Sequence, residues 1–416
     1  MDRAVQSGLP DDLRHKRVTT MAQTRPVALR TVGVEEELML VDPVDGRPAS
    51  AGDSVLEAAQ EWLGAGADHQ VEKEFKMEQT EIGSSPTTDI RALRSELLNL
   101  RRAVAAAAGS TGVHVVAVAT SPFKVRPTAT IDERYSRMLD MFGIIARQQL
   151  TCGQHIHVSV GSPDEGVAAL DRIRPWLPLL TAISANSPYW QGQDTGYASY
   201  RTIAWGQWPT AGPTEAFGDI DGYHRAIKGL LETGAAMDDG MIYFDARLSA
   251  SYPTLEIRVP DVCTDVGDSA LIAALARALV DTAATDWHHG RQPDPIRIEV
   301  LRGATWRAAR FGLAGDLLDH RSRELVPAWA MVDALVEHVL TALRANGDLD
   351  FVLEAIARLR RTGTGADLQR AEFARRGLPG ALGRCGLAVA VRRGRGAAAG
   401  FRAAGPGTAR PGTGGP

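Results

Sequence analysis

The sequence predicts a single domain of the α+β class. Short runs that alternate polar and apolar residues, as strands do, are interspersed with amphipathic helical runs up to about residue 260. Beyond residue 268 the chain is expected to be helical. The stretch from 30 to 376 contains no internal repeat and no obvious linker, and 44% apolar content in 416 residues is enough for one large core.

The strand predictions rest on alternation, β-branched residues and turn signals. The first strand ends at the Asp-Pro pair at 42–43, and the sequence GSSP at 83–86 interrupts the second acidic segment. The last two strands are expected to form a hairpin joined by 248–252. The expected strands are 31–41, 71–82 (as one strand or two), 113–119, 154–160, 241–247 and 253–259.

The helix predictions rest on helical spacing of apolar residues. Asp89 is the expected N-cap of a long helix that runs through the alanines at 105–108. The other expected helices are 54–63, 131–149, roughly 164–184, and four or five segments between 268 and 376. The segment 186–220, rich in Gly, Trp, Tyr, Pro and Thr, has no clear period and is long for a loop, which indicates a functional segment.

Composition excludes several classes of function. The 46 basic and 50 acidic residues nearly balance, giving a net charge of -4, which argues against a nucleic-acid binder and favours small-molecule partners. Three widely spaced cysteines without a CxxC pair fit a reducing, cytoplasmic compartment. The chain has no run of about 18 apolar residues and no apolar signal-peptide core at its start, so we expect neither membrane insertion nor export.

The charge is unevenly distributed along the chain. From residue 386 onward there are five arginines and no acid, so the remainder carries about -9. Gly, Ala, Pro and Arg dominate this tail and offer little apolar surface to offset the entropy of ordering. We therefore expect a disordered N-terminal extension at 1–29, a catalytic domain at 30–376, and a disordered tail at 377–416.

The first strand carries acids among apolar residues. In GVEEEL, Glu35 and Glu37 are two residues apart, so they project from the same face about 6.5 to 7 Å from each other. Two carboxylates at that distance repel by roughly 3 kcal/mol at an effective dielectric of about 20, and a bound cation would remove this cost. An exposed strand end with surface acids is the alternative.

Three further strands carry charged or imidazole side chains. Glu74 and Glu81, with Glu72 and Glu78 nearby, supply oxygen ligands of the kind that Mg²⁺ or Mn²⁺ prefers; a charged amphipathic strand is the alternative. His155 and His157 share one strand face and could ligate metal, donate to phosphate, or be structural. In 254–261, one face bears Thr254, Glu256 and Arg258.

Taken together, these motifs resemble the carboxylate-amine ligases, that is, the type 2 glutamate-cysteine ligases of the glutamine synthetase-like superfamily. The resemblance spans roughly 30 to 375, and its most specific element is the aromatic segment at 186–213. It is carried by GVEEEL at 33–38, EFKMEQTEIGSSP at 74–86, GQHIHV at 153–158, NSPYWQGQDTGYASYRTIAWGQWPTAGP at 186–213, PTLEIRVPDVC at 253–263, TWRAARFGLAGDLLD at 305–319 and GTGADLQR at 363–370.

The resemblance implies a curved antiparallel sheet that forms an active-site bowl, with helices outside and with ATP and Mg²⁺ (or Mn²⁺) inside. It implies metal ligation by Glu35, Glu37, Glu74, Glu81, His155 and Glu256. It also implies that His157 and Arg258 hold ATP phosphates, and that Arg201 and, more weakly, Arg307 act on the substrate carboxylate or the transferred phosphoryl group. The alternative for Arg201 is a structural arginine stacked on aromatic rings.

The implied activity is ATP-dependent ligation of glutamate to cysteine through an acyl phosphate, in which positioning and electrostatics do most of the catalysis. Cys152 and Cys263 are read as small buried residues, and no P-loop or dinucleotide fingerprint occurs in a credible context. The alternatives are a ligase for another acid and amine, a guanidino phosphotransferase, or a non-catalytic binding protein. By analogy, a homodimer is plausible, and neither nucleic acid nor membrane is an expected partner.

Overall fold

A computed structural model describes residues 29–64 and 70–375 of the chain. The tail predicted to be disordered, 377–416, and the third cysteine, Cys385, lie outside the described residues, and so does the predicted N-terminal extension apart from Leu29.

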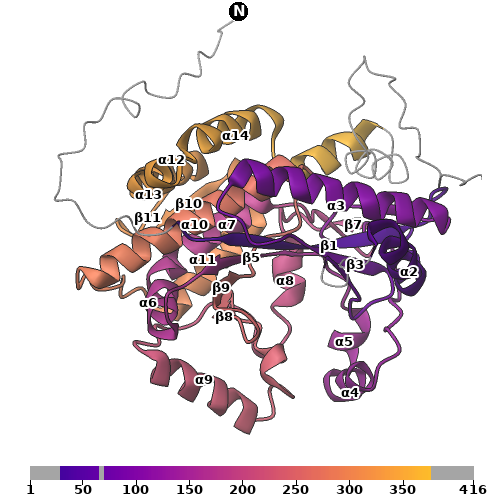
Figure 1. The fold of residues 1–416 in the computed structure, drawn as a ribbon, viewed down its shortest axis with the longest axis horizontal. Helices are drawn as coiled ribbons and strands as arrows, with labels where there is room; N and C mark the ends of the chain where they lie inside the picture. Colours follow the sequence, from indigo (N-terminus) through magenta and orange to yellow (C-terminus); the bar gives the residue numbers. More distant parts are fainter. Residues whose placement is uncertain (1–28, 65–69, 376–416) are drawn as a thin grey trace, which may run out of the picture.

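The centre of the fold is a seven-stranded sheet in which every pairing is antiparallel (Figure 1). Six strands follow the order β2-β3-β1-β5-β9-β8, and β4 also pairs with β1. The strands are β1 (Val32–Val41), β2 (Val71–Glu72), β3 (Gln79–Gly83), β4 (His114–Val116), β5 (Gln154–Ser159), β8 (Ala246–Leu248) and β9 (Thr254–Ile257). The predicted α+β class and antiparallel sheet are confirmed.

Helices cover the apolar face of this sheet. The long helix α10 (Val266–His288) contacts β1 and β5 and is buried along most of its length. It also packs against α3 (Ile90–Ser110), which lies over the sheet in Figure 1 and contacts α2 (Gly52–Leu63). The apolar positions of the central strands, such as Val34 and Ile156, face these helices because alternate residues of a strand point to one side.

The N-terminus of α3 forms as its sequence predicts. The Asp89 carboxylate accepts hydrogen bonds from the backbone N–H groups of Arg91 and Ala92, two of the donors that a helix leaves unpaired. The buried face of α3 includes Leu93, Leu97 and one arginine, whose partner is described below.

The remaining helices enclose the sheet and its loops. A glycine with φ of 58°, Gly143, divides the predicted helix 131–149, and Pro175 lies in a short 3₁₀ segment that divides 164–184. These helices are α4 (Glu133–Phe142), α5 (Ile144–Gln148), α6 (Pro163–Ile173), α7 (Leu177–Ser184), α8 (Tyr200–Trp205), α9 (Ile220–Glu232), α11 (Ile298–Phe311), α12 (Ala328–His338), α13 (Leu340–Asn346) and α14 (Leu349–Thr362).

The expectation that the chain is purely helical after residue 268 is wrong at one place. A two-stranded hairpin, β10 (Asp316–Asp319) with β11 (Glu324–Pro327), separates α11 from α12. Each strand has only four residues, too few to show a period in the sequence. Helix α9 was not expected from the sequence. Within the aromatic segment the structure contains α8 and a small hairpin of β6 (Tyr189–Trp190) and β7 (Gln193–Asp194).

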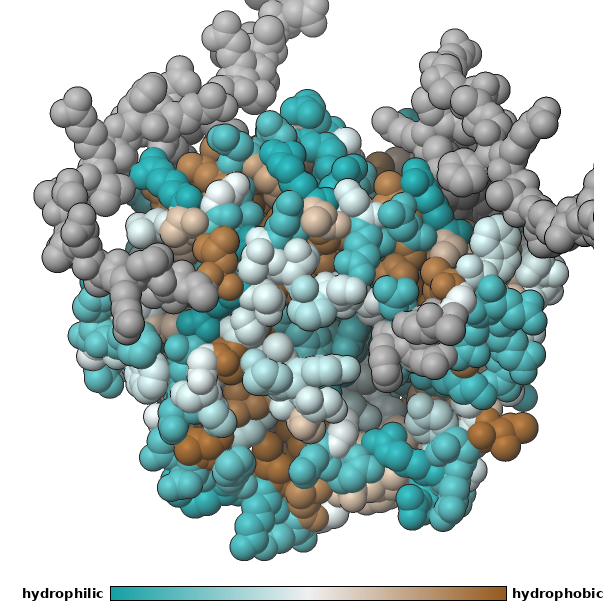
Figure 2. Space-filling view, viewed as in Figure 1, coloured by the Kyte–Doolittle hydropathy of each residue, from teal (hydrophilic) through white to brown (hydrophobic). Residues whose placement is uncertain are grey.

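On the face shown in Figure 2, hydrophilic and hydrophobic side chains are interspersed. None of the helices in the described part of the chain combines the length and apolar character that crossing a membrane requires. Cys152 and Cys263, the two described cysteines, are unpaired and buried, as the sequence predicts.

Candidate active site

Strand register brings the predicted site residues together on the sheet face opposite the main helices. Across β1 and β5, Glu35 lies opposite His155. Across β1 and β3, Glu37 lies opposite Glu81. Residues directly opposite each other in antiparallel strands have their side chains on the same face, about 5 Å apart. Side chains far apart in sequence thus become one cluster, which we call the acidic cluster (Glu35, Glu37, Glu74, Glu81, His155, His157 and Glu256).

Glu35 lies between the two imidazoles of the acidic cluster. Its Oε2 is 3.2 Å from Nδ1 of His155, and its Oε1 is 3.2 Å from Nε2 of His157. Nε2 of His155 lies 3.9 Å from a Glu37 oxygen and makes no hydrogen bond although it is buried. His157 lies opposite Glu256 across β5 and β9, which completes the ring of side chains.

The spacing of these groups suits metal ligation. Three sets each offer ligand atoms that all lie within 4.8 Å of one another. Oxygen and imidazole donors at this spacing are those that divalent cations use. The three sets are Glu35, Glu81 and His155; Glu35, His157 and Glu256; and Glu37, Glu74 and Glu81.

Crowding and burial perturb the carboxyl groups of the acidic cluster. Burial, together with the charge of Glu37, raises the pKa of Glu74 to about 7. Burial and the neighbouring Glu74 and Glu35 raise the pKa of Glu81 well above its usual value. At Glu35 burial acts in the same direction, but the two histidines outweigh it and lower the pKa. The protein alone therefore supplies too little positive charge for Glu74 and Glu81.

Glu256 is compensated differently, because two arginines flank it. Nε of Arg247 is 2.6 Å from one Glu256 oxygen, and Nη1 of Arg258 donates a hydrogen bond to the other. Burial alone would raise the pKa of Glu256, yet Arg258 and Arg247 lower it to about 2. Arg258 also lies 3.5 Å from Nδ1 of His155, so its guanidinium sits at the rim of the acidic cluster.

The two competing glutamates of the second acidic segment are not members of the candidate ligand sets, although Glu72 lies opposite Glu81 and lines the second cavity described below. Glu78 accepts hydrogen bonds from the Ser50 hydroxyl at 2.6 Å and from the backbone N–H of Thr128, so it ties two loops together. Glu72 is exposed on β2. The structure thus brings Glu74 and Glu81, and neither of these competitors, into the candidate ligand sets.

Three adjoining cavities run through the site. The central cavity, about 360 Å³, contains the acidic cluster. A second cavity of about 470 Å³ meets it at Glu35, Glu81 and His157. A third, of about 590 Å³, meets it at Arg258 and at an aromatic wall of Trp205, Trp208 and Tyr243. We call these the central, strand-edge and aromatic cavities. A ligand in either outer cavity could reach the central one.

Comparison with known proteins gives the family. The model of glutamate-cysteine ligase family 2 matches residues 31–384. This chain belongs to that family. A Frankia alni protein named "Putative glutamate–cysteine ligase 2-2" is 54% identical over 360 residues, covering 84% of this chain and 94% of the relative. A Streptomyces coelicolor protein named "Putative glutamate–cysteine ligase 2" is 47% identical over 349 residues, covering 84% and 96%.

Solved structures support the fold of this glutamate-cysteine ligase family 2 member. The crystal structure of glutamate–cysteine ligase from Francisella tularensis in complex with AMP superposes with a TM-score of 0.63 at 13% identity, covering 87% of this chain and 88% of that one. The crystal structure of a bifunctional glutathione synthetase from Pasteurella multocida gives 0.61 at 15% identity, covering 88% and 53%. At these identities the likeness concerns the fold alone.

The three arginines predicted to be catalytic are placed differently in this family member. Arg258 faces both the central and the aromatic cavity. Arg201 is buried, lines the aromatic cavity, and donates to the backbone carbonyls of Arg258 and Val259 at 3.3 Å each. Arg307 donates to the Asp316 carbonyl at 2.6 Å, stacks over Phe311, and lines neither cavity.

Sequence reasoning missed several charged residues of the site. Arg247 lies directly opposite Glu256 in β8, and the alternation of Asp245 and Arg247 in the predicted strand 241–247 was the signal that could have found both. Arg134 lines the central cavity from α4, and Arg302 lines the aromatic cavity from α11. Nothing in the sequence marks these last two, because only the packing of distant helices brings them to a cavity.

The described cysteines have the character of buried apolar residues. Burial raises the pKa of both Cys152 and Cys263 well above the usual value, so neither thiol ionises readily. Neither lines the central cavity.

Proposed function

We propose that this chain is an ATP-dependent ligase that joins the γ-carboxyl group of glutamate to the amine of cysteine through an acyl phosphate. One observation carries the proposal: the acidic cluster, with three overlapping sets of candidate ligands, lies beside Arg258 where three cavities meet. Family membership and the names of the relatives supply the substrates.

The residues present fit a divalent cation. Nε2 of His155 is buried without a hydrogen bond, and Glu74 and Glu81 are more crowded with negative charge than the protein compensates. We assign Mg²⁺, with Mn²⁺ as the alternative, to Glu35, Glu37, Glu74, Glu81, His155 and Glu256. When bound, the cation neutralises phosphate oxygens, so that a carboxylate can approach ATP.

The remaining residues act on the phosphates and the substrate carboxylate. The strand-edge cavity is the place we propose for ATP, because it meets the central cavity at His157, which could donate to a phosphate oxygen. Arg258, on the opposite side of the acidic cluster, would hold the transferred phosphoryl group or the attacking carboxylate. Arg201 would shape this region through the carbonyls of Arg258 and Val259, while the contacts of Arg307 support a structural role.

The reaction then takes two steps. The substrate carboxylate attacks the γ-phosphorus and gives an acyl phosphate and ADP. The amine attacks the acyl carbon, phosphate leaves, and an amide remains. Because both partners of the first step are anionic, charge neutralisation and alignment by a prearranged site account for most of the catalysis. We also propose a cytoplasmic enzyme, which two unpaired buried cysteines support, and a homodimer by analogy.

Product analysis of the full-length enzyme with ATP and Mg²⁺ tests this function. We expect glutamate plus cysteine to give ADP, phosphate and γ-glutamylcysteine in equal amounts, and a panel of other acids and amines to give less. Another preferred pair would identify a ligase of different specificity. ADP and a phosphorylated guanidine without free phosphate would identify a phosphotransferase. No ADP with any partner would contradict catalysis altogether and favour a binding protein.

A further inference from the structure

The aromatic cavity contains charges and polar atoms that the protein leaves without partners. Asp245 immediately precedes β8, and its backbone N–H and C=O are both hydrogen-bonded. Its carboxylate makes no hydrogen bond or ion pair within the described residues. Burial raises the pKa of Asp245 to about 7, and the charge of Arg201 offsets this only in part. A carboxylate in this position lacks the cation that would stabilise it.

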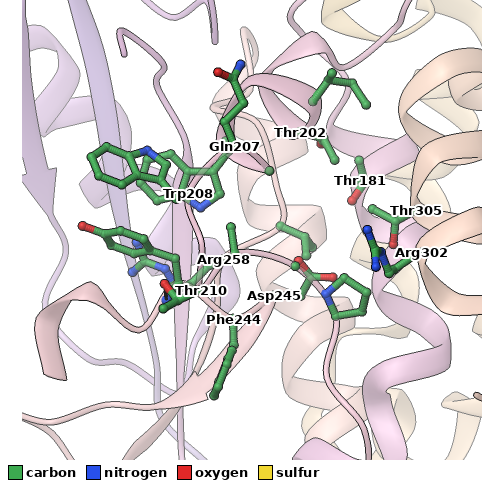
Figure 3. Close-up of a pocket in the computed structure, with 18 of the residues that line it drawn as sticks. Thr181, Thr202, Gln207, Trp208, Thr210, Phe244, Asp245, Arg258, Arg302 and Thr305 are labelled. Atoms are coloured by element: carbon green, nitrogen blue, oxygen red, sulfur yellow. Dashed lines mark hydrogen bonds between the residues drawn. The ribbon is translucent and has the colours of Figure 1, made fainter. Parts of the chain in front are cut away.

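The facing wall is formed by two helices that also leave groups free. Arg302 and Thr305 lie three residues apart on α11, so both point from one helix face, and Thr181 on α7 packs beside them. Figure 3 shows these three side chains together across the cavity from Asp245. Arg302 is exposed to solvent and makes no hydrogen bond or ion pair among the described residues, whereas the hydroxyls of Thr181 and Thr305 are buried without a partner.

Further polar atoms without hydrogen bonds belong to residues that line this cavity on the side of the central cavity. Nε1 of Trp208 and the Nε atoms of Arg201 and Arg258 are buried without hydrogen bonds, and all three residues line this cavity. Since more than nine in ten buried polar groups in proteins find a partner, so many on one cavity wall indicate a ligand that supplies them. Its volume of about 590 Å³ is typical of small-molecule sites.

We infer that the aromatic cavity binds an α-amino acid as a zwitterion, with Asp245 receiving the ammonium group and Arg302 and Thr305 receiving the α-carboxylate. A zwitterion brings a cation to the buried acid and an anion to the exposed guanidinium of Arg302, which has no ion pair within the described residues, so both ends of the ligand find a partner. The aromatic wall shared with the central cavity then directs the rest of the molecule towards Arg258. The inference rests on the proposed function and adds the residues that recognise its amino-acid substrate.

Two substrates of the proposed reaction share this chemistry, because glutamate and cysteine are both α-amino acids. Glutamate would use the cavity for its α end while its γ-carboxylate reaches the central cavity. Cysteine would use it to hold the attacking amine. Kinetics can separate the two, because hydrolysis of the acyl phosphate without an amine depends on glutamate alone.

Titration calorimetry with a non-hydrolysable ATP analogue and Mg²⁺ tests the inference directly. Each amino acid is compared with an analogue that lacks the ammonium group, glutarate for glutamate and 3-mercaptopropionate for cysteine. We expect the full-length protein to bind at least one amino acid at least about tenfold tighter than its analogue, and Asp245→Asn to abolish this preference. Arg302→Gln should weaken binding of the amino acid by about tenfold.

Matched variants control for general effects of the substitutions. Asp221→Asn, exposed on α9, and Arg361→Gln, exposed at the end of α14, change the same groups away from the cavities and should leave binding unchanged. In the assay without cysteine, a raised KM for glutamate in Asp245→Asn would identify glutamate as the ligand of the aromatic cavity. A raised KM for cysteine alone, measured for the same variant in the complete reaction, would identify cysteine as that ligand.

Two results would overturn the inference. One is unchanged affinity and unchanged KM for both amino acids in Asp245→Asn and Arg302→Gln. The other is equal binding of the amino acids and their deamino analogues by the unmodified protein. Failure of the proposed function gives a different result, since binding that depends on Asp245 would persist in a protein that releases no ADP with any pair.

Discussion

The two faces of strand β1 differ in the partners of their buried carboxylates. Glu36 points away from the acidic cluster, is fully buried, and is held by Arg101 from α3 at 2.7 and 2.8 Å and by the Ser269 hydroxyl at 2.6 Å. Its neighbours Glu35 and Glu37 point into the acidic cluster, where histidines and further acids surround them.

The difference shows how composition alone can mislead. Of three consecutive glutamates on one strand, Glu36 is neutralised by an arginine, which we call the fixed side of β1. Glu35 and Glu37 form the open side, which we propose binds an exchangeable cation. The fixed side stabilises the fold, because Arg101 also donates to the carbonyls of Cys263 and Thr264 just before α10. If the open side binds a cation as we propose, its crowded carboxylates lower the stability of the fold until that cation is bound.

Removal of the arginine that neutralises Glu36 should produce the largest change in the free energy of unfolding. Arg101→Met leaves Glu36 buried without a counter-charge, and breaking such a pair costs about 3–5 kcal/mol. Urea unfolding should show this loss, whereas Arg102→Met, on the exposed side of the same helix, should stay within about 0.5 kcal/mol of the unmodified protein. A loss below about 1 kcal/mol for Arg101→Met would show that the two faces of β1 do not differ as described.

Removing a carboxylate from the open side should lower the rate of catalysis and leave folding intact. Glu35→Gln removes a member of two of the three candidate ligand sets, so ADP release should fall by at least about a hundredfold. Circular dichroism should remain that of the folded protein. Glu61→Gln, exposed on α2, is the matched control. Full activity in Glu35→Gln would show that the metal assignment is wrong.

The open side should also respond to pH and Mg²⁺ together. A carboxyl group whose pKa is raised on folding holds its proton more tightly in the folded state. Its contribution to stability therefore falls as pH rises from the unfolded value of 4.5 to the folded value, about 7 for Glu74. Mg²⁺ requires the ionised form, so it should raise the melting temperature more at about pH 8 than at about pH 6.

Saturation at a hundredfold excess over Kd corresponds to about 2.7 kcal/mol of stabilisation. Differential scanning calorimetry with Mg²⁺ and with a chelator measures the shift, and Glu74→Gln should reduce both the shift and its pH dependence. An equal shift at both pH values would argue that Mg²⁺ binds away from Glu74 and Glu81.

The smallest expected effect concerns the helix that carries Arg101. Asp89→Ala removes the N-cap of α3 and should lower the free energy of unfolding by about 1 kcal/mol. Asp89→Asn should keep most of the stabilisation that the N-cap provides, because Asn is also a good N-cap residue. Ligase turnover should not change in either variant, because α3 supplies only the fixed side of β1. A loss of turnover would link the position of α3 to the acidic cluster.

Alternation predicted most of the sheet strands, although the strand expected at 241–247 begins only at Ala246, and it predicted which side chains share a strand face. The full set of residues in the acidic cluster followed from the family resemblance. Strand register cannot be obtained from alternation, and it is register that places Glu35 opposite His155 and Arg247 opposite Glu256. The sequence also could not assign Glu36 to Arg101, since 65 positions separate them. For the aromatic cavity, the sequence indicated only the aperiodic segment that forms much of its wall, because the rest of the wall comes from α7, α11 and the chain before β8.

The order of the strands has a consequence for how the enzyme is made. The acidic cluster draws on β1, β3, β5, β9 and the loop between β2 and β3, so its first and last members, Glu35 and Glu256, are 221 positions apart in the chain. A nascent chain that has emerged only as far as β8 holds Glu35, Glu37, Glu74 and Glu81 but neither Glu256 nor Arg258. Long-range pairings of this kind form late. Loading with Mg²⁺ is therefore expected to follow synthesis of β9, and a ribosome-bound fragment ending before Thr254 should show no Mg²⁺-dependent protection from protease.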